Sequence, residues 1–306
     1  MSHDAARPPP ARPGAIAEAS GSARETSVAA PRPLGLIAGS GRFPLLFAEA
    51  AARAGTRVVA AAHEGEADPA LAASVASLAW VKLGQLGRIC ENLKSAGCTE
   101  AVFCGGIRKV RLFDVRPDWL GLKVLARLRS FGDDAALRAI ADALEEEGIR
   151  IVSPLPFCKE LLAPAGPLGK HKLSDEQRRD AQVGCDAAQA LGRLDVGQTV
   201  VVKRGVVLAV EAVEGTDACI ARGGSLARGG GDGPVVVKLA KPGQDERFDL
   251  PAVGPGTIAA LAQAGCSALL LEAHRTLVLD KALLVRAADE ARIAVEGFEM
   301  VGVPHI

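Results

Sequence analysis

The chain has 306 residues, of which 49% are hydrophobic, so it is long enough for one large domain or two of ordinary size. Aromatic residues make up 3% and tyrosine is absent, so the cores must be built from Ala, Val and Leu. The 36 basic and 36 acidic residues cancel, which argues against a general nucleic-acid binder. No apolar stretch approaches the length that spans a bilayer.

Residues 1–32 are rich in Pro, Ala, Ser and Arg and lack the apolar core of a signal peptide, so we predict a disordered tail. Seven cysteines are scattered through the rest of the chain without CxxC spacing. Free, buried thiols in a reducing compartment explain them best, and the predicted location is cytoplasmic.

The first half alternates short apolar strands with Ala-rich helices, as a parallel α/β sheet does. In chain order we predict a strand over 34–38, a helix over 44–54, a strand over 57–62, a helix over 87–96, a strand over 100–104, a helix over 132–148 and a strand over 150–153.

Two of these strands end in glycine-rich turns. Gly39, Ser40 and Gly41 follow the first strand, and Gly105 and Gly106 follow the third. Ligands of open parallel sheets bind beyond the carboxyl ends of the strands, so the two turns could line one crevice and hold phosphate on their amides. Two alternatives stay open, namely contact with a sugar or base, and a tight bend that only packs helix on strand.

Prolines and glycines crowd residues 154–169, too densely for a regular element, and this segment is the candidate hinge. The predicted fold is therefore two α/β domains joined by a Pro-rich linker, the first Rossmann-like. The domains are predicted at 33–157 and 174–306, with the linker at 158–173. In the second domain we predict a helix over 175–191, strands over 199–203, 206–211, 235–239 and 268–271, and helices after Thr216, Thr257 and Lys281.

Carboxylates gather at two places in the second half. Asp217 follows the strand over 206–211, and Asp249 lies in the charged run 241–251. Mg²⁺ prefers one or two carboxylates together with phosphate and water oxygens, so the two aspartates could hold a phosphate-bound Mg²⁺ if they converge. The alternative for Asp217, or for its neighbour Thr216, is to cap the following helix.

The run 241–251 also carries two cations that could neutralise phosphate. Arg247 offers a bidentate fork and Lys241 a point charge. Asp249 could act as a general base or as a metal ligand, because both roles need an ionised carboxylate near the phosphate. Alternatively, Arg247 pairs with Asp245 on the surface and the run is a solvated loop.

Five motifs occur in one order, at 36–44, 132–135, 197–198, 207–218 and 241–251. This set resembles the LpxI-type UDP-2,3-diacylglucosamine pyrophosphatases of Gram-negative lipid A synthesis, from about residue 34 to the C-terminus. The chain departs from the family pattern at Ser40, where the turn is often all glycine, and at His274, where relatives commonly show glycine. His274 could narrow the acyl chamber or lie on the surface.

The resemblance implies a Mg²⁺-dependent hydrolase whose two α/β domains enclose the lipid nucleotide. Water would attack the α-phosphorus of UDP-2,3-diacylglucosamine, releasing UMP and 2,3-diacylglucosamine 1-phosphate, also called lipid X. The family residue whose loss stops turnover falls on Asp249. With the motifs above, the expected substrate-binding residues are Gly39, Ser40, Gly41, Gly105, Gly106, Thr216, Lys241 and Arg247, and the expected metal ligands are Asp217 and Asp249.

A diacylated substrate motivates the hypothesis of peripheral contact with the inner membrane. The apolar pattern at 119–128 could wall the acyl chains, or it could be an amphipathic helix that faces its own core. Neither a protein partner nor nucleic acid is expected. The alternative functions are a non-catalytic lipid-nucleotide carrier and a nucleotide-dependent oxidoreductase, although the full glycine fingerprint of the latter is missing.

Overall fold

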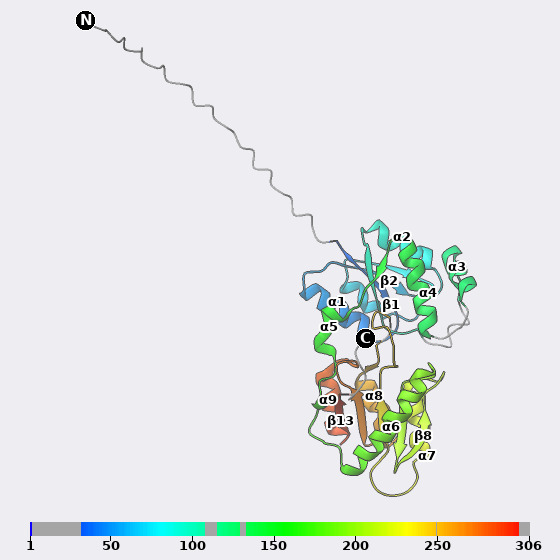
Figure 1. Cartoon of the computed structure of the whole chain (residues 1–306), viewed down its shortest axis with the longest axis vertical. Helices are drawn as coiled ribbons and strands as arrows, with labels where there is room; N and C mark the ends of the chain where they lie inside the picture. The colour runs from blue at the N-terminus through cyan, green and yellow to red at the C-terminus, as the bar shows by residue number, and fades with distance from the viewer. Residues whose placement is uncertain (2–31, 108–114, 129–132, 249, 300–306) are drawn as a thin grey trace. The chain divides into compact units, whose positions relative to one another are not determined.

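The computed structural model describes residues 1, 32–107, 115–128, 133–248 and 250–299 (Figure 1). Apart from its two end residues, the predicted tail at 1–32 lies outside this part of the chain. From Arg32 onward the described residues form two main sheets, each covered by helices on both faces. This confirms the predicted two-part α/β architecture, whereas the exact domain boundaries stay predictions.

The first sheet is entirely parallel, with strand order β3-β2-β1-β4-β5. Because β2 and β3 extend to one side of β1, and β4 and β5 to the other, the strand order reverses between β1 and β4, as in a Rossmann-like sheet. Such a reversal leaves a crevice at the carboxyl ends of these two strands. The strands are β1 (Leu34–Ala38), β2 (Val58–His63), β3 (Ser77–Val81), β4 (Glu100–Cys104) and β5 (Arg150–Ile151).

Helices cover both faces of this sheet. The short 3-10 helix η1 (Pro69–Ala73) and α1 (Phe43–Arg53) share one core with the strands, while α2 (Leu86–Ser95), α3 (Trp119–Arg127) and α4 (Asp133–Glu146) contribute to the core on the other face. Since both faces are packed, β1 and β2 are buried at every position.

The second sheet is mixed, with order β6-β13-β11-β9-β7-β8. Its centre is parallel, and β6 and β7 run antiparallel to their neighbours. A separate parallel pair joins β10 (Ala252–Val253) to β12 (Leu277–Val278). The six strands are β6 (Gly166–Pro167), β7 (Thr199–Lys203), β8 (Val206–Val210), β9 (Val235–Lys238), β11 (Ala268–Glu272) and β13 (Ala294–Phe298).

Four helices accompany the second sheet. They are α6 (Asp175–Arg193), α7 (Thr216–Leu226), α8 (Pro255–Gln263) and α9 (Lys281–Glu290). Glycine lets two of them approach the valine-rich strands closely: a Cβ on Gly184 of α6 would lie 2.5 Å from Val237, and one on Gly223 of α7 would lie 2.6 Å from Val201. None of the helices in the described part of the chain combines the length and apolarity needed to cross a membrane.

The Pro-rich segment differs from its sequence prediction, because it does contain short regular elements. These are α5 (Leu155–Cys158), the 3-10 helix η3 (Lys159–Leu161) and the edge strand β6. A proline in the first turn of α5 fits helical geometry, since the amide it lacks would have no partner there. A two-residue edge strand likewise tolerates Pro167.

All seven cysteines are free and buried, as predicted. Removal from water disfavours the thiolate, and this desolvation raises the pKa of Cys185, Cys219 and Cys266 to about 12. None of these thiols is therefore poised as a nucleophile at neutral pH.

We predict that a thiol-specific disulfide reagent at pH 8 labels the native chain slowly, because reaction needs an exposed thiolate. In the denatured chain, all seven thiols should react and release seven equivalents of the coloured product. Stopped-flow absorbance with and without denaturant measures the labelling rate of the native and of the denatured chain. Rapid labelling of one thiol in the native chain would contradict the burial described above.

Candidate active site

The two glycine turns lie side by side, as the sequence predicted. Ser40 and Gly106 form an isolated antiparallel bridge, in which the Ser40 amide donates to the Gly106 carbonyl at 2.6 Å and the Gly106 amide donates back at 3.2 Å. The Ser40 hydroxyl also donates to the Gly106 carbonyl, at 2.8 Å. Serine in place of glycine therefore adds a hydrogen bond that holds the turn closed.

This close approach explains the glycines themselves. A Cβ on Gly39 would lie 2.3 Å from the Gly106 carbonyl oxygen, and a Cβ on Gly105 would lie 2.3 Å from the Ser40 carbonyl oxygen. Gly105 also has a φ of +82°, a backbone angle that residues with a side chain rarely adopt. The turns thus bring backbone, rather than side chains, to the crevice at the β1–β4 reversal.

A pocket of about 270 Å³ opens at these turns. Its wall combines the two glycine turns with side chains from the second half of the chain. Cations, an amide and a carboxylate face aromatic and aliphatic groups there, which is the mixed lining typical of a small-molecule site. The lining residues are Ser40, Gly41, Arg42, Phe43, Phe103, Gly105, Gly106, Pro154, Gln198, Lys238, Glu246, Arg247, Phe248, Leu250, Ala252 and Leu279.

Lys238 and Gln198 are lining residues that the sequence interpretation did not select. Lys238 ends β9 and is only 4% exposed. Gln198 follows Gly197, where a Cβ would lie 2.0 Å from the Glu211 carbonyl oxygen, so only glycine admits this path of the backbone. A lysine closing an otherwise all-valine strand was the signal that could have identified Lys238.

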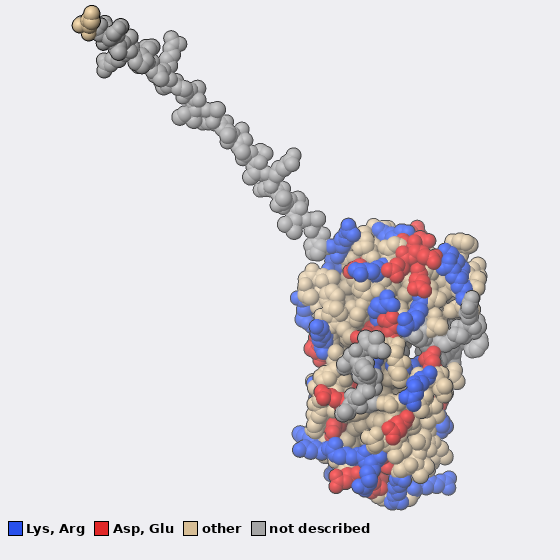
Figure 2. Space-filling model, viewed as in Figure 1, with Lys and Arg blue, Asp and Glu red and all other residues tan. Residues whose placement is uncertain are grey.

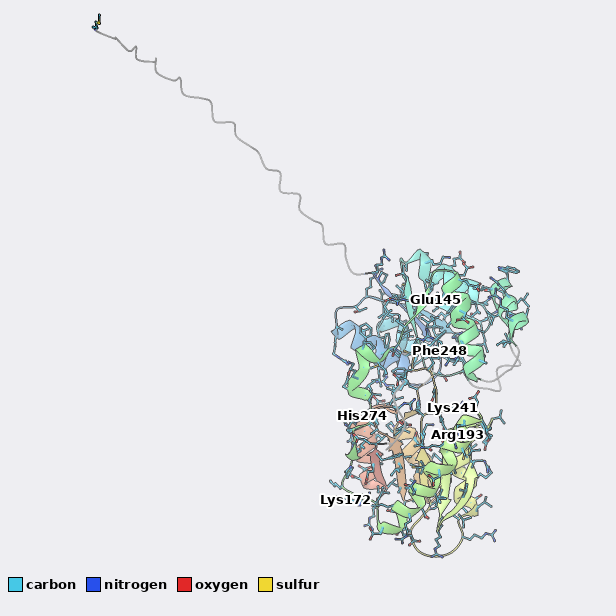
Figure 3. All side chains as sticks on the ribbon, viewed as in Figure 1. Glu145, Lys172, Arg193, Lys241, Phe248 and His274 are labelled. Carbon is cyan, nitrogen blue, oxygen red and sulfur yellow. The ribbon has the colours of Figure 1, made fainter. Side chains whose placement is uncertain are left out.

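The charged run enters the pocket through Arg247 and Phe248. Phe248 is 6% exposed and belongs to the hydrophobic core of the first sheet, with its ring 6.1 Å from that of Phe103 (Figure 3). The Arg247 guanidinium lies 4.7 Å from the centre of the Phe248 ring, within cation–π range. Burial of one aromatic residue therefore positions the neighbouring arginine.

Arg247 also pairs with Asp245, as in the alternative that the sequence left open. Its Nε and Nη2 donate to the carboxylate at 3.0 and 2.8 Å. These hydrogen bonds are the main reason that the pKa of Asp245 is lowered. Arg247 is thus paired with Asp245 and also lines the pocket, and its contact with phosphate stays a prediction.

The other predicted phosphate contact, Lys241, has a different place. Its Nζ lies 2.6 Å from the Asp195 carboxylate, and it is absent from the pocket lining (Figure 3). In this structure Lys241 ties the start of the charged run to the loop that follows α6.

Thr216 and Asp217 begin α7, but neither lines the pocket. The Thr216 hydroxyl donates to Glu211 at 2.9 Å and accepts from Lys238 at 2.7 Å, so it is engaged on both sides. The helix has Gly215 at its N-cap without a side-chain cap, so the predicted capping role of Thr216 or Asp217 is wrong. Asp217 is exposed in the first turn, where a carboxylate favours the helix dipole.

Asp249, the predicted catalytic residue, lies outside the described residues, so its convergence with Asp217 stays a prediction. Within the described residues there is no group of three His, Cys, Asp or Glu that could hold a metal by itself. Mg²⁺ needs fewer protein ligands when phosphate supplies the rest. Glu246 is the carboxylate among the described lining residues, and such a donor set fits a phosphate-bound Mg²⁺.

His274 lies on the surface, which decides between the two sequence alternatives. Its φ of +62° is in the left-handed region that favours glycine, and this explains why glycine suits the position. The imidazole lies 3.5 Å from the carboxylate of Glu299, and its side chain is 63% exposed (Figure 3).

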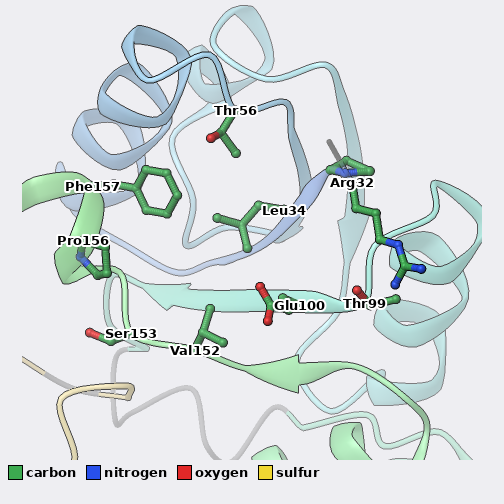
Figure 4. A pocket seen from close by; sticks show the side chains of 10 residues that line it. Arg32, Leu34, Thr56, Thr99, Glu100, Val152, Ser153, Pro156 and Phe157 are labelled. Carbon is green, nitrogen blue, oxygen red and sulfur yellow. The ribbon is translucent and has the colours of Figure 1, made fainter. Parts of the chain in front are cut away.

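A second pocket, of about 340 Å³, lies near the start of β1 and β4 (Figure 4). Its lining includes Leu34, Thr56, Glu100 and Phe157, and none of the predicted site residues. It lies at the amino ends of the strands, where α/β sheets do not usually bind ligands, and Glu100 is already paired with Arg150. The smaller pocket is therefore the better candidate.

Comparisons with known proteins agree on one family. Residues 33–161 match the model of the LpxI N-terminal domain, and residues 164–296 match that of the LpxI C-terminal domain. A protein of Caulobacter vibrioides named UDP-2,3-diacylglucosamine pyrophosphatase LpxI is 38% identical over 276 residues, covering 88% of this chain and 98% of the relative.

Solved structures match only weakly. A biotin carboxylase domain of a thermophilic 2-oxoglutarate carboxylase gives a TM-score of 0.25 at 14% identity, covering 55% of this chain and 34% of the other. Phosphoribosylglycinamide synthetase from Anaerococcus prevotii also gives a TM-score of 0.25 at 14% identity, with coverages of 57% and 38%. The chain spans well under half of these solved chains, and TM-scores this low do not establish a shared fold.

We predict that Arg247→Met raises the pKa of Asp245 toward its ordinary value, because the main hydrogen bonds to the carboxylate are lost. The folded pKa is depressed, so the pairing stabilises the fold above the ordinary carboxyl pKa of about 3.9, and this stabilisation fades as the pH falls through the lower folded value. Carboxyl-detected NMR titration measures the shift.

Arg138→Met is the matched control, since Arg138 lies 3.4 Å from the same carboxylate but acts on its pKa only as the weakest cause. Equal shifts in the two variants would show that hydrogen bonding by Arg247 does not dominate.

Proposed function

This chain belongs to the LpxI family, and on that premise we propose that it hydrolyses the diphosphate of UDP-2,3-diacylglucosamine in lipid A synthesis. The products would be UMP and 2,3-diacylglucosamine 1-phosphate, formed by attack of water on the α-phosphorus. The observation that carries this proposal is the pocket in which two glycine turns meet Lys238 and Arg247.

That pocket matches the chemistry of a diphosphate ester. Glycine turns allow backbone to approach phosphate closely, and the lining cations Arg42, Lys238 and Arg247 oppose its negative charge. Phe43, Phe103 and Leu250 add apolar surface to the same wall. An uncharged substrate would leave buried charge at Lys238 uncompensated, which disfavours such a ligand.

Mg²⁺ is part of the proposal. When bound, it would neutralise phosphate charge and polarise the phosphorus–oxygen bonds. Glu246 is the described lining carboxylate that fits this role, and the sequence adds Asp249 as a proposed ligand, whereas Asp217, the other ligand expected from the sequence, does not line the pocket. In this scheme Asp249 takes a proton from the attacking water or orients it, while Arg247 holds charge that develops on the phosphate oxygens.

We also propose that the protein acts in the cytoplasm in peripheral contact with the inner membrane. Helix α3 buries Leu120 and Val124 but leaves Trp119, Leu122 and Leu125 exposed at 76%, 54% and 41%. The buried residues confirm the helix that faces its own core. The exposed residues form a second apolar face on the same helix. Exposed Trp and Leu on one side of a helix suit the membrane–water interface.

Among the described residues, charge contributes little to the exposed apolar face of α3. Lys123 and Arg127 of α3 both bind Glu146, at 2.8 and 2.7 Å. Their hydrogen bonds, that of Arg127 first, lower the pKa of Glu146 to about 2, so the carboxylate stays ionised and balances them. The two signs are also interspersed over the visible face in Figure 2. Apolar insertion, rather than attraction to anionic lipid, would drive the contact.

We predict that the wild-type protein releases UMP from UDP-2,3-diacylglucosamine in the presence of Mg²⁺ and that Asp249→Ala abolishes release while retaining substrate binding. Chromatographic detection of UMP and a separate binding titration measure the two properties. Asp249→Asn keeps the shape and removes the charge, so it separates the loss of a base or ligand from a packing defect. Full activity in both variants would remove Asp249 from the mechanism, and binding without release by the wild type would favour the carrier alternative.

For the membrane contact, we predict that Leu122→Ser lowers the fraction of protein that sediments with lipid vesicles. Leu226→Ser is the matched control, because Leu226 is exposed to 53% in α7, away from α3. The vesicles should be tested with and without anionic lipid, and the loss should be similar in both. Wild-type protein that stays entirely in the supernatant would refute the contact.

A further inference from the structure

We propose that Lys238 is the phosphate-binding cation of the pocket and that Thr216 and Glu211 are the residues that position it. This inference rests on the proposed function for the identity of the substrate, but the anion site itself can be tested without that substrate. The three residues come from different places: Lys238 ends β9, Thr216 begins α7, and Glu211 directly follows β8.

The three side chains form a chain of hydrogen bonds in which the two charged ends are buried and Thr216 is half-buried. Lys238 Nζ donates to Thr216 Oγ1 at 2.7 Å, and Thr216 Oγ1 donates to Glu211 Oε1 at 2.9 Å. Lys238 is 4% and Glu211 8% exposed. Because a hydroxyl accepts and donates at once, Thr216 connects the two opposite charges although they make no direct ion pair among the described residues.

The network is incomplete as it stands. An ammonium has three N–H donors, and within the described residues Thr216 is the recorded hydrogen-bond partner of Lys238. Lys238 lines the pocket, so its remaining donors are available to a group bound there. Glu211 Oε2 and Gln198 Oε1 are also buried without a partner in this part of the chain. Buried polar atoms of this kind are rare in native proteins unless a bound group or water completes them.

Phosphate is the ligand class that the incompletely bonded Lys238 favours, whereas the orphaned oxygens of Glu211 and Gln198 are acceptors and call for a donor such as water. A buried cation without a direct carboxylate partner gains most from an anion, because attraction is strong where water is excluded. The backbone of the glycine turns lines the same pocket and can supply further donors. The other two lining cations are already paired with carboxylates, Arg247 with Asp245 and Arg42 with Asp280, so Lys238 is the least satisfied of the three.

Isothermal titration of the full chain with inorganic pyrophosphate, without metal and then with Mg²⁺, tests the site. We expect Lys238→Met to weaken binding by roughly 10- to 100-fold, the loss typical of a charge-assisted hydrogen bond. Thr216→Val should weaken binding in the same direction because the hydroxyl link is gone. Thr216→Ser should restore the wild-type affinity, which a loss of packing alone would not predict.

Lys203→Met is the matched control, since Lys203 is also a buried lysine of the second sheet but donates to the Gly229 carbonyl at 3.3 Å, outside the pocket. Thermal denaturation shows which variants fold. If Lys238→Met does not fold, the comparison of Thr216→Val with Thr216→Ser decides.

Wild-type protein that fails to bind pyrophosphate, or a folded Lys238→Met with the affinity of Lys203→Met, would overturn the inference. So would Thr216→Ser behaving like Thr216→Val. The proposed reaction fails separately, if the wild type releases no UMP from the lipid nucleotide while the pyrophosphate site responds as expected.

Discussion

Burial of Phe248 is the interaction on which the candidate site depends. The residue belongs to the run between β9 and β10, yet its ring is part of the hydrophobic core beneath the first sheet and lies edge-on to Phe103. Burying an aromatic ring of this size contributes about 1.5–3 kcal/mol. Arg247 stacks on the same ring, so a packing interaction fixes the direction of a charged group.

The first sheet contributes backbone, and the second contributes charge. At the β1–β4 reversal, two glycine turns are held together by paired amides and carbonyls with no space for a Cβ at Gly39 or Gly105. The second sheet brings Lys238 to the same pocket from the end of a valine-rich strand. A phosphate group needs both, because amide donors give it a shape to fit and a buried cation offsets its charge.

Hydrogen bonds within the second half offset part of the cost of burying charge there. The Thr216 hydroxyl hydrogen-bonds to both Lys238 and Glu211. Glu272 accepts a hydrogen bond from the Ala240 amide and pairs with Arg275. An isolated charge at any of these positions would be strongly destabilising. Four buried side-chain atoms lack a partner in the described residues, on Asn92, Gln198, Glu211 and Thr276, and of these four residues Gln198 lines the pocket.

The sequence by itself determined the alternating strands and helices, the two glycine turns at one sheet edge and the family, because periodicity, turn chemistry and ordered motifs are local properties. It missed β3 and β13, whose half-polar or mixed patterns are weak signals, and the short elements of the Pro-rich segment. Only the tertiary structure decided which cations enter the pocket. Lys241 and Arg247 both lie in the charged run, yet Lys241 pairs with Asp195 outside the pocket, while Arg247, though paired with Asp245, lines the pocket together with Lys238. The physical reason is that the place of a charged side chain depends on its partners, and those of Lys238 and Lys241 lie far from them in the sequence.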